Sequence, residues 1–382
     1  MFSKEHIKRV MVRDRSDDWF VLRTIGTEFH PGGIGGSEIA SVLNLSQWLG
    51  LNELFYIKIG AHNPKRFLNP AMQRGITMEP HLRKYWTYYR GDDQWAEDMN
   101  SNNVLPYRKN RLVKYPVYNK KYPFLLMNLD AVIPRGERKF LSEDRVLHDC
   151  PLEIKTANSF VKRKYETGVP PGYYVQIQAQ MIVMEADYGE LFFESDGQLS
   201  LYPIQKNEAI QKVIIDRCKE FWDKVLLGRE LMKELEQQAY GSEKYQKISN
   251  RISNLAPPIA PISAEEEFIK ESWRMEQVSM ACDERLNDDY YMYNSLKHLE
   301  KIAAELQQGY KNNMLGYLKD NQVAQAIIST DKSFGIQTRK YKEKEVKILY
   351  SKGANKLNQD QKDLILSKSL ALIEGIKSLL IN

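Results

Sequence analysis

Two acidic residues and one lysine occur in neighbouring apolar stretches of the chain. Asp130 ends the run FLLMNLD, and Glu153 and Lys155 lie two apart in PLEIKTA. Side chains two apart in a strand point to the same side of a sheet, so two adjacent strands would bring the three groups together. Carboxylates that are buried close together repel each other, and a hard divalent cation such as Mg²⁺ removes that cost. A lysine beside such a cation can orient or activate a water, an arrangement that suits phosphodiester hydrolysis.

The elements that must position these groups follow from the residue patterns. Residues 103–118 and 122–134 are predicted to be strands, 135–149 a polar loop, and 150–157 the strand that carries Glu153 and Lys155. The prolines of VPPGYYVQIQAQMIVMEA precede a helical pattern, and YGELFFES and QLSLYPI form a hairpin pattern. A central sheet with a helix beside it is therefore predicted around the acidic groups.

Polar residues at helical spacing flank these strands. Gln176 and Gln180 lie four apart in the helix after the second predicted carboxylate strand. A longer helix is predicted from about Pro70 to Arg90, and it carries Glu79. Each of these residues alone is also explained as an ordinary polar position on an exposed helix face.

The N-terminal part of the chain contains a second group of chemically interesting residues. Residues 16–27 are predicted to be a helix capped by Ser16 or Asp17, with Trp19 and Arg23 on one face. The turn GGIGGS follows, and Ser37 is predicted to cap the next helix.

Two interpretations of this N-terminal region stay open. The glycine turn lacks the GK[ST] of a phosphate-binding P-loop and the spacing of a dinucleotide fingerprint. It is therefore either a plain tight turn or an anion site at a helix N-terminus. Arg23 is either a surface ion-pair partner or a phosphate ligand.

A further helix is predicted from Ser46 to about Ile59, and it includes Trp48.

Composition excludes several classes of protein. No apolar run approaches the length of a membrane span, and the first residues do not resemble a signal peptide. The three cysteines are far apart, which argues against disulfides, zinc and iron–sulfur clusters and favours a reducing cytoplasm. The formal charge of +5 permits a polyanionic partner without requiring one.

A change in composition after about Leu235 predicts the domain organisation. Residues 1–235 are predicted to be the core, 236–263 a linker that ends in a proline cluster, and 264–382 a mainly helical extension. The extension is predicted to contain a short β-hairpin near 333–350 and a final amphipathic helix from Asn358 to Leu380, and to serve self-association or partner binding.

Six segments of the chain occur together in a recognisable order. They are WFVLR, GIGGSEIASVLNLS, RGITMEP, LDAVI, LEIK and YYVQIQAQM. In order and spacing they resemble the YqaJ / lambda-exonuclease group of the PD-(D/E)xK nuclease superfamily, over about residues 16–225. The resemblance implies an α/β (α+β) fold, a restriction-endonuclease-like core in which helices flank a central mixed β-sheet.

The resemblance implies a metal site at the acidic residues. Asp130 and Glu153 would bind Mg²⁺ or Mn²⁺ together with the backbone carbonyl of Ile154. Lys155 would position or activate the attacking water, and Glu79 would help to hold a second metal or its waters.

The same resemblance implies roles for the flanking residues. Gln176 would support the site from its helix, whereas Gln180 matches no family role well. Arg23 and Ser37 match positions that bind the terminal 5′ phosphate or the phosphate near the cut.

The implied activity is metal-dependent exonucleolytic hydrolysis of linear duplex DNA, from 5′ to 3′, which leaves a 3′ overhang in phage or prophage recombination. The implied partners are double-stranded DNA ends, a single-strand annealing protein and further copies of the chain in a ring; no membrane is expected. The expected location is the cytoplasm of a bacterial host or phage-infected cell. A long insertion between Pro134 and Cys150 and the C-terminal extension leave the ring and the polarity open. The alternatives are an endonuclease of a defence or restriction system, or a DNA-end-binding scaffold with a vestigial site.

Overall fold

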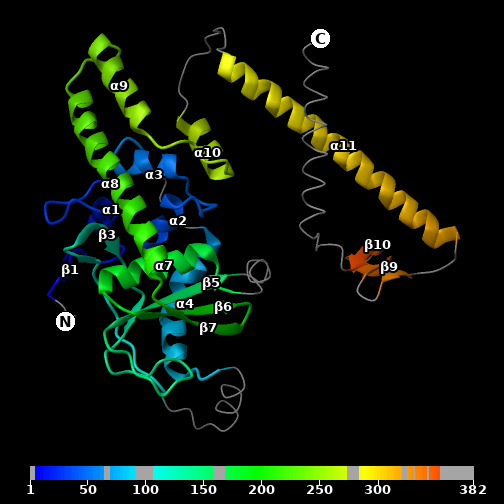
Figure 1. Cartoon of the computed structure of the whole chain (residues 1–382), viewed down its shortest axis with the longest axis horizontal. Helices are drawn as coiled ribbons and strands as arrows, with labels where there is room; N and C mark the ends of the chain where they lie inside the picture. The colour runs from blue at the N-terminus through cyan, green and yellow to red at the C-terminus, as the bar shows by residue number, and fades with distance from the viewer. Residues whose placement is uncertain are drawn as a thin grey trace. The chain divides into compact units, whose positions relative to one another are not determined.

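The computed structural model shows a chain with two compact units, Met1–Arg274 and Met275–Asn382 (Figure 1). Each unit is described by itself. The structure describes residues 5–63, 69–91, 106–157, 168–272, 284–320, 325–329, 332–341 and 344–352.

The first unit is built around a mixed four-stranded sheet with the strand order β4-β5-β6-β7. The outer pairs of strands are antiparallel, and β5 and β6 are parallel. The strands are β4 (Ala131–Ile133), β5 (Cys150–Ala157), β6 (Tyr188–Ser195) and β7 (Gln198–Gln205). All eight residues of β6 are buried, as expected for a strand with neighbours on both sides and helices on both faces. The predicted fold class, a mixed sheet flanked by helices, is confirmed.

Two helices cover the opposite faces of this sheet, α4 (Pro70–Tyr88) and α7 (Pro171–Met184) (Figure 1). Alternate residues of β5 face them in turn, because side chains of a strand alternate between faces. Glu153 is bonded to glutamines of α7, whereas the neighbouring Thr156 lies beside Gly75 of α4. The helix α4 continues through Pro80.

The far face of the sheet contains a buried ion pair. Arg108 donates to both oxygens of Glu190 on β6, at 2.7 and 2.9 Å, and both side chains are fully enclosed. Glu190 also accepts from the indole of Trp86 at 2.8 Å and from the hydroxyl of Tyr188 at 2.6 Å. The guanidinium lies 4.0 Å from the centre of the Trp86 ring. These bonds satisfy a charge that would otherwise be costly to bury, and they join α4 to β6.

A second, antiparallel sheet has the strand order β1-β2-β3. Its strands are β1 (Ile7–Arg9), β2 (Val117–Asn119) and β3 (Tyr122–Met127). The strand predicted over 122–134 is therefore wrong in one respect, because it is broken after Met127 and its two halves belong to different sheets. The strand predicted over 103–118 is also wrong over most of its described part, where only the last two residues belong to β2.

The N-terminal helices differ from prediction in two places. Ser16 caps α1 (Asp17–Thr24) as predicted, and its hydroxyl accepts from the Trp19 amide. Ser37 is not a cap, because it lies inside the short 3₁₀ helix η1 (Gly36–Glu38), which leads into α2 (Ile39–Val42). The helix predicted from Ser46 begins only at α3 (Leu51–Lys58), so Trp48 lies in the preceding loop and is 87% exposed.

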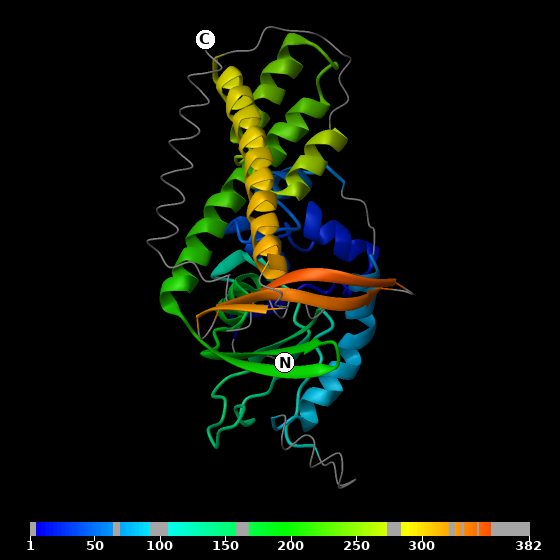
Figure 2. The same cartoon turned by 90° about the vertical axis from the view of Figure 1, so that its right-hand side faces the viewer.

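The described part of the first unit contains three further helices. They are α8 (Glu208–Glu236), α9 (Glu243–Leu255) and α10 (Ser263–Ser272). The helices α8 and α9 pack side by side (Figures 1 and 2). Because α9 lies inside the segment predicted as a linker, that segment is partly helical, and the first compact unit extends to Arg274. The predicted limits of 1–235, 236–263 and 264–382 stay a prediction.

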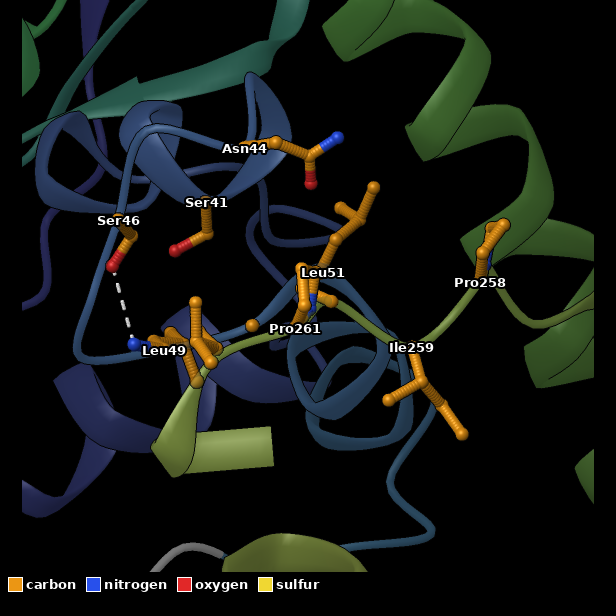
Figure 3. A pocket seen from close by; sticks show the side chains of 11 residues that line it. Ser41, Asn44, Ser46, Leu49, Leu51, Pro258, Ile259 and Pro261 are labelled. Carbon is orange, nitrogen blue, oxygen red and sulfur yellow. Dashed lines mark hydrogen bonds between the residues drawn. The ribbon is translucent and has the colours of Figure 1, made fainter. Parts of the chain in front are cut away.

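The residues between α9 and α10 pack against the loop before α3. Pro258, Ile259 and Pro261 face Ser41 and Leu51 across a cavity of about 350 Å³ (Figure 3). The carboxylate of Glu265 on α10 accepts from the Asn52 amide at 2.9 Å, at the start of α3. Asn52 in turn donates to the carbonyl of Pro257 at 2.6 Å. This segment is therefore a packed part of the first unit.

The second unit contains a long helix, α11 (Glu284–Asp320), and an antiparallel sheet with the order β10-β9-β8. Its strands are β8 (Gln325–Ser329), β9 (Lys332–Tyr341) and β10 (Lys344–Lys352). The helix predicted from Asn358 to Leu380 lies outside the described residues. In the part of the chain that the structure describes, no helix combines the length and the apolar character needed to cross a membrane.

Gly228 of α8 is expected to be required by packing. An added Cβ would lie 2.6 Å from Cγ2 of Ile59 and 3.1 Å from Cζ of Phe55. A helical Gly→Ala exchange normally gains up to about 1 kcal/mol, whereas overpacking costs about 1–3 kcal/mol. We expect Gly228→Ala to lower the free energy of unfolding by about 1 kcal/mol or more in urea denaturation followed by tryptophan fluorescence.

Gly172→Ala of α7 is the matched control. Its Cβ would meet only the Cβ of Ala40, at an ordinary 3.5 Å, so this variant should unfold at the same urea concentration as wild type or a slightly higher one. A Gly228→Ala protein as stable as the control would contradict the packing argument.

Candidate active site

The carboxylate of Glu153 is the most enclosed charged group of the site, with 1% of the residue exposed. Its Oε1 accepts from Gln176 Nε2 at 2.5 Å and from the ammonium of Lys155, and its Oε2 accepts from Gln180 Nε2 at 2.5 Å. The two glutamines are one turn apart and therefore share the face of α7 that meets β5. Three donors thus fix the orientation of this carboxylate.

Asp130 lies in the break between β3 and β4. Its Oδ2 accepts from the backbone amide of Ile154 at 2.8 Å. The antiparallel β4 begins at Ala131, opposite Leu152, so it ends before it could pair with that amide. The aspartate therefore replaces a missing ladder bond and is held next to the strand of the other acid.

The charges of this group strongly affect one another. Burial, and then the charge of Glu153, raise the pKa of Asp130 well above its ordinary value. Burial alone would lower the pKa of Lys155, but the charges of Glu153 and Asp130 raise it. The structure therefore brings together all three residues on which the sequence interpretation depends, as two acids that repel each other beside one cation.

Glu79 approaches the same place from α4, but with a partner that the sequence did not predict. Its Oε2 accepts from Nη2 of Arg15 at 2.6 Å, and its charge also raises the pKa of Asp130. Arg15 lies before α1 with a φ of 63°, and its charge is also close to Asp14. No local spacing in the sequence relates Arg15 to Glu79, because 64 residues separate them.

The oxygens grouped at this site suit the predicted divalent ion. Within the described ranges, no three or more Asp, Glu, His or Cys side chains are grouped as a ready metal cage. The available oxygens are those of Asp130 and Glu153 and the predicted carbonyl of Ile154. Mg²⁺ commonly uses one or two carboxylates and keeps several waters, so this set fits it or Mn²⁺. Glu79 could contribute only after its bond to Arg15 is exchanged.

The second predicted group, Arg23 and Ser37, is also brought together. Nη2 of Arg23 lies 3.4 Å from the exposed hydroxyl of Ser37 and 2.8 Å from Oε1 of Glu38. The guanidinium carbon lies 4.9 Å from the centre of the Trp19 ring. An added Cβ at Gly35 would lie 2.7 Å from Nη2, so only glycine lets the guanidinium lie against this turn.

Glu38 and Lys58 stand behind Arg23. Oε2 of Glu38 accepts from Lys58 Nζ at 2.8 Å and from the Gly35 amide at 2.6 Å. Despite its burial, the charges of Arg23 and Lys58 lower the pKa of Glu38 to about 2. Burial lowers the pKa of Lys58 to about 8. The sequence analysis predicted a role for neither residue. The available signals were that Glu38 directly follows Ser37 and that Lys58 lies in a predicted helix.

Asn128 connects the two groups. Its amide donates to Asp14 Oδ1 at 2.7 Å, and its oxygen accepts from the indole of Trp19 at 3.1 Å. Asn128 is two residues before Asp130. The same break in the strand therefore positions Asp130 in the carboxylate group and, through Asn128, holds the helix α1 that carries Arg23.

The fold and the site together define a mixed α/β protein with a carboxylate–lysine centre beside an arginine–serine turn. The sequence of residues 27–187 matches the family described as the YqaJ-like viral recombinase domain. This match confirms the resemblance to the YqaJ group that the sequence motifs indicate.

Individual relatives are more distant. The uncharacterized protein YqaJ of Bacillus subtilis (strain 168) is 23% identical over 309 residues, which are 78% of this chain and 78% of that protein. The crystal structure of an alkaline exonuclease (LHK-Exo) from Laribacter hongkongensis is 17% identical, with a TM-score of 0.39, and covers 57% of this chain and 97% of its own. The structure of LHK-Exo in complex with dAMP has a TM-score of 0.40 with the same identity and coverage.

The pKa of Glu38 predicts an acid sensitivity of the first unit. A carboxyl whose pKa is lowered on folding, here from 4.5 to about 2, stabilises the fold above its ordinary pKa and loses that contribution as the pH falls toward 2. We expect a loss of about 1 kcal/mol of unfolding free energy from this group between about pH 6 and about pH 3.5.

The comparison with Glu38→Gln isolates this contribution. Other carboxyls titrate in the same range, so the measurement is the difference between wild type and variant in urea unfolding, followed by tryptophan fluorescence at both pH values. The variant should be less stable near neutrality, and the difference should shrink in acid. A difference that does not change with pH would show that Glu38 is not charged and paired as described.

Proposed function

We propose that the chain is a metal-dependent DNA exonuclease that hydrolyses linear duplex DNA in phage or prophage recombination. The observation that carries this proposal is the convergence of Asp130, Glu153 and Lys155, with Asp130 bonded to the amide of Ile154. The match to a viral recombinase domain family supports the same substrate class.

The residues of the centre have separable roles in this proposal. Asp130 and Glu153, with the carbonyl of Ile154, would hold Mg²⁺ or Mn²⁺, which when bound neutralises phosphate charge and acidifies a water. Lys155 holds its proton firmly between two acids, and so orients the attacking water and stabilises the charge that develops on the phosphate. Gln176 and Gln180 keep Glu153 from turning away.

The arginine–serine turn would bind the end of the DNA. The guanidinium of Arg23 suits bidentate recognition of phosphate, and the hydroxyl of Ser37 lies beside it on the exposed side of the turn. If a terminal 5′ phosphate binds here, the next phosphodiester lies toward Asp130 and cleavage proceeds from 5′ to 3′, leaving a 3′ overhang. Glu79 would assist a second ion or its waters.

The removal of Lys155 tests the centre. We expect Lys155→Ala to reduce the hydrolysis of linear duplex DNA by about 100-fold or more, because the attacking water loses its cationic partner. Binding of the same DNA should persist. Release of labelled nucleotides measures hydrolysis, gel shift measures binding, and Lys219→Ala, which removes an exposed lysine of α8, is the control.

The outcomes separate the exonuclease from its alternatives. Digestion of a closed circle as fast as of linear DNA would show an endonuclease. Binding without product in Mg²⁺ or Mn²⁺, by the wild-type chain, would show an end-binding scaffold. Unchanged digestion by Lys155→Ala would remove this residue from the mechanism.

Gln180 is expected to be a positioning residue. Gln180→Leu leaves Oε2 of Glu153 without its donor, and loss of such supporting bonds typically costs about 10- to 100-fold in activity or metal affinity. We expect kcat to fall with little change in KM for linear DNA, and a higher Mg²⁺ concentration to be needed for half-maximal rate.

Gln178→Leu is the matched control on the same helix. Gln178 is equally buried, but it bonds to the carbonyl of Gln205 and to Asn207 and Gln211, away from Glu153. Its loss should lower stability and leave kcat per folded molecule unchanged. Equal loss of kcat in both variants would argue that Gln180 acts only through stability.

The partners expected from the sequence, a single-strand annealing protein and further copies of the chain, stay predictions of this proposal. The cytoplasmic location and a role of the second unit in self-association or partner binding are also predictions.

A further inference from the structure

Lys58 is a buried cation with an unusual set of acceptors. Its side chain is fully enclosed, and its ammonium donates to the carbonyl of Arg23, to the carbonyl of Gly33 at 2.9 Å and to Oε2 of Glu38 at 2.8 Å. Those acceptors come from α1, from the glycine turn and from η1. One ammonium on α3 therefore holds together the three segments that carry the predicted phosphate ligands.

Glu38 divides a single negative charge between two cations. One oxygen accepts from Arg23, and the other accepts from Lys58 and from the amide of Gly35. The side of the guanidinium that faces Glu38 is thereby occupied, while the hydroxyl of Ser37 remains exposed. The network thus sets the orientation of Arg23 relative to Ser37.

Positive charge exceeds negative charge around this carboxylate in the described residues. Arg229 of α8 adds a third cation, which donates to the carbonyls of Lys58, Pro31 and Thr24. Asp14 acts on Arg23 through space but is itself close to Arg15. Surplus charge in a mostly buried cluster favours an anionic ligand at its exposed edge, and a second negative charge on that ligand strengthens the effect.

We propose that Lys58 and Glu38 are positioning residues that set the charge and orientation of Arg23, so that the turn selects a doubly charged phosphate end over an uncharged hydroxyl end. This inference rests on the proposed function for its ligand, the 5′ end of a DNA duplex. Lys58 does not touch the phosphate; it acts through Glu38 and the two carbonyls. Because the ammonium of Lys58 takes up part of the charge of Glu38, the carboxylate neutralises Arg23 only partly, and the guanidinium stays available to a ligand.

The test is a binding measurement without hydrolysis. A labelled DNA hairpin with one blunt end carries either a 5′ phosphate or a 5′ hydroxyl, and its Kd is measured by fluorescence anisotropy with the full chain in EDTA. Wild type should bind the phosphorylated end more tightly. In Lys58→Met the preference should fall by about tenfold, because Glu38 then pairs with Arg23 alone and the surplus charge drops by one.

Asn119→Leu is the control for general destabilisation. Asn119 is also fully buried and also loses bonds on replacement, to the Val183 carbonyl and to Glu185, but neither of these partners belongs to the turn. This variant should keep the wild-type preference. Equal loss of preference in both variants would overturn the proposed role of Lys58.

The pH dependence of the wild-type preference decides the matter even if Lys58→Met fails to fold. The charged and titratable groups around Lys58 are Arg23, Glu38 and Arg229, with the thiol of Cys218 near Glu38. With a pKa of about 8, Lys58 is the group among them whose charge changes most between about pH 7 and about pH 9, because burial lowers the pKa of Arg229 only to about 10 and a terminal phosphate is already doubly ionised. The preference should therefore fall across this range in wild type and stay flat in Lys58→Met.

Two further results would overturn the inference. One is a wild-type chain with no preference for the phosphorylated end; the other is a preference that survives in Lys58→Met and does not change with pH. Because no hydrolysis is measured, failure of the proposed nuclease activity would be seen separately, in the digestion of linear DNA.

Discussion

The buried negative charge of Glu153 is the constraint on which the site depends. A carboxylate inside a protein needs donors on both oxygens, and here α7 supplies two glutamines while the same strand supplies Lys155. A second acid, Asp130, is held close by a backbone amide. The repulsion between the two acids is offset by the ammonium of Lys155, which pairs with Glu153. The packing of α7 on β5 is therefore set by polar contacts as well as by apolar ones.

The break between β3 and β4 joins this centre to the arginine–serine turn. If the chain continued as one strand, Asp130 would lie in a ladder and Asn128 would not reach both Asp14 and Trp19. Because the chain passes from one sheet to the other there, residues 128–130 contribute both to the carboxylate centre and to the contacts of α1. The acids and the arginine–serine turn are thereby linked through residues 128–130 of the backbone.

Local periodicity was enough to predict part of this arrangement. The alternation in β5, the spacing of Gln176 and Gln180, and the cap at Ser16 are properties of neighbouring residues, and the sequence shows them directly. Arg15 and Lys58 were not predicted from the sequence. The partner of Arg15 is a carboxylate 64 residues away, and Lys58 bonds to backbone carbonyls of other segments. Ser37 was misassigned as a cap because η1 begins one residue earlier, at Gly36, so that Ser37 already lies inside a helical turn. Trp48 was predicted to lie in a helix, yet it is exposed in the loop before α3. Long-range partners, rather than propensities, account for these failures.

The contact between Gly50 and Glu265 has a consequence for where this fold ends. A Cβ at position 50 would lie 1.7 Å from Oε1 of Glu265, so the carboxylate reaches the first turn of α3 only over a bare backbone. The opposite end of that helix carries Lys58. A fragment that stops at the end of α8 would therefore lack the carboxylate that accepts from the amides at the start of α3. The first compact unit therefore includes α10, well beyond residues 27–187, which match the YqaJ-like domain.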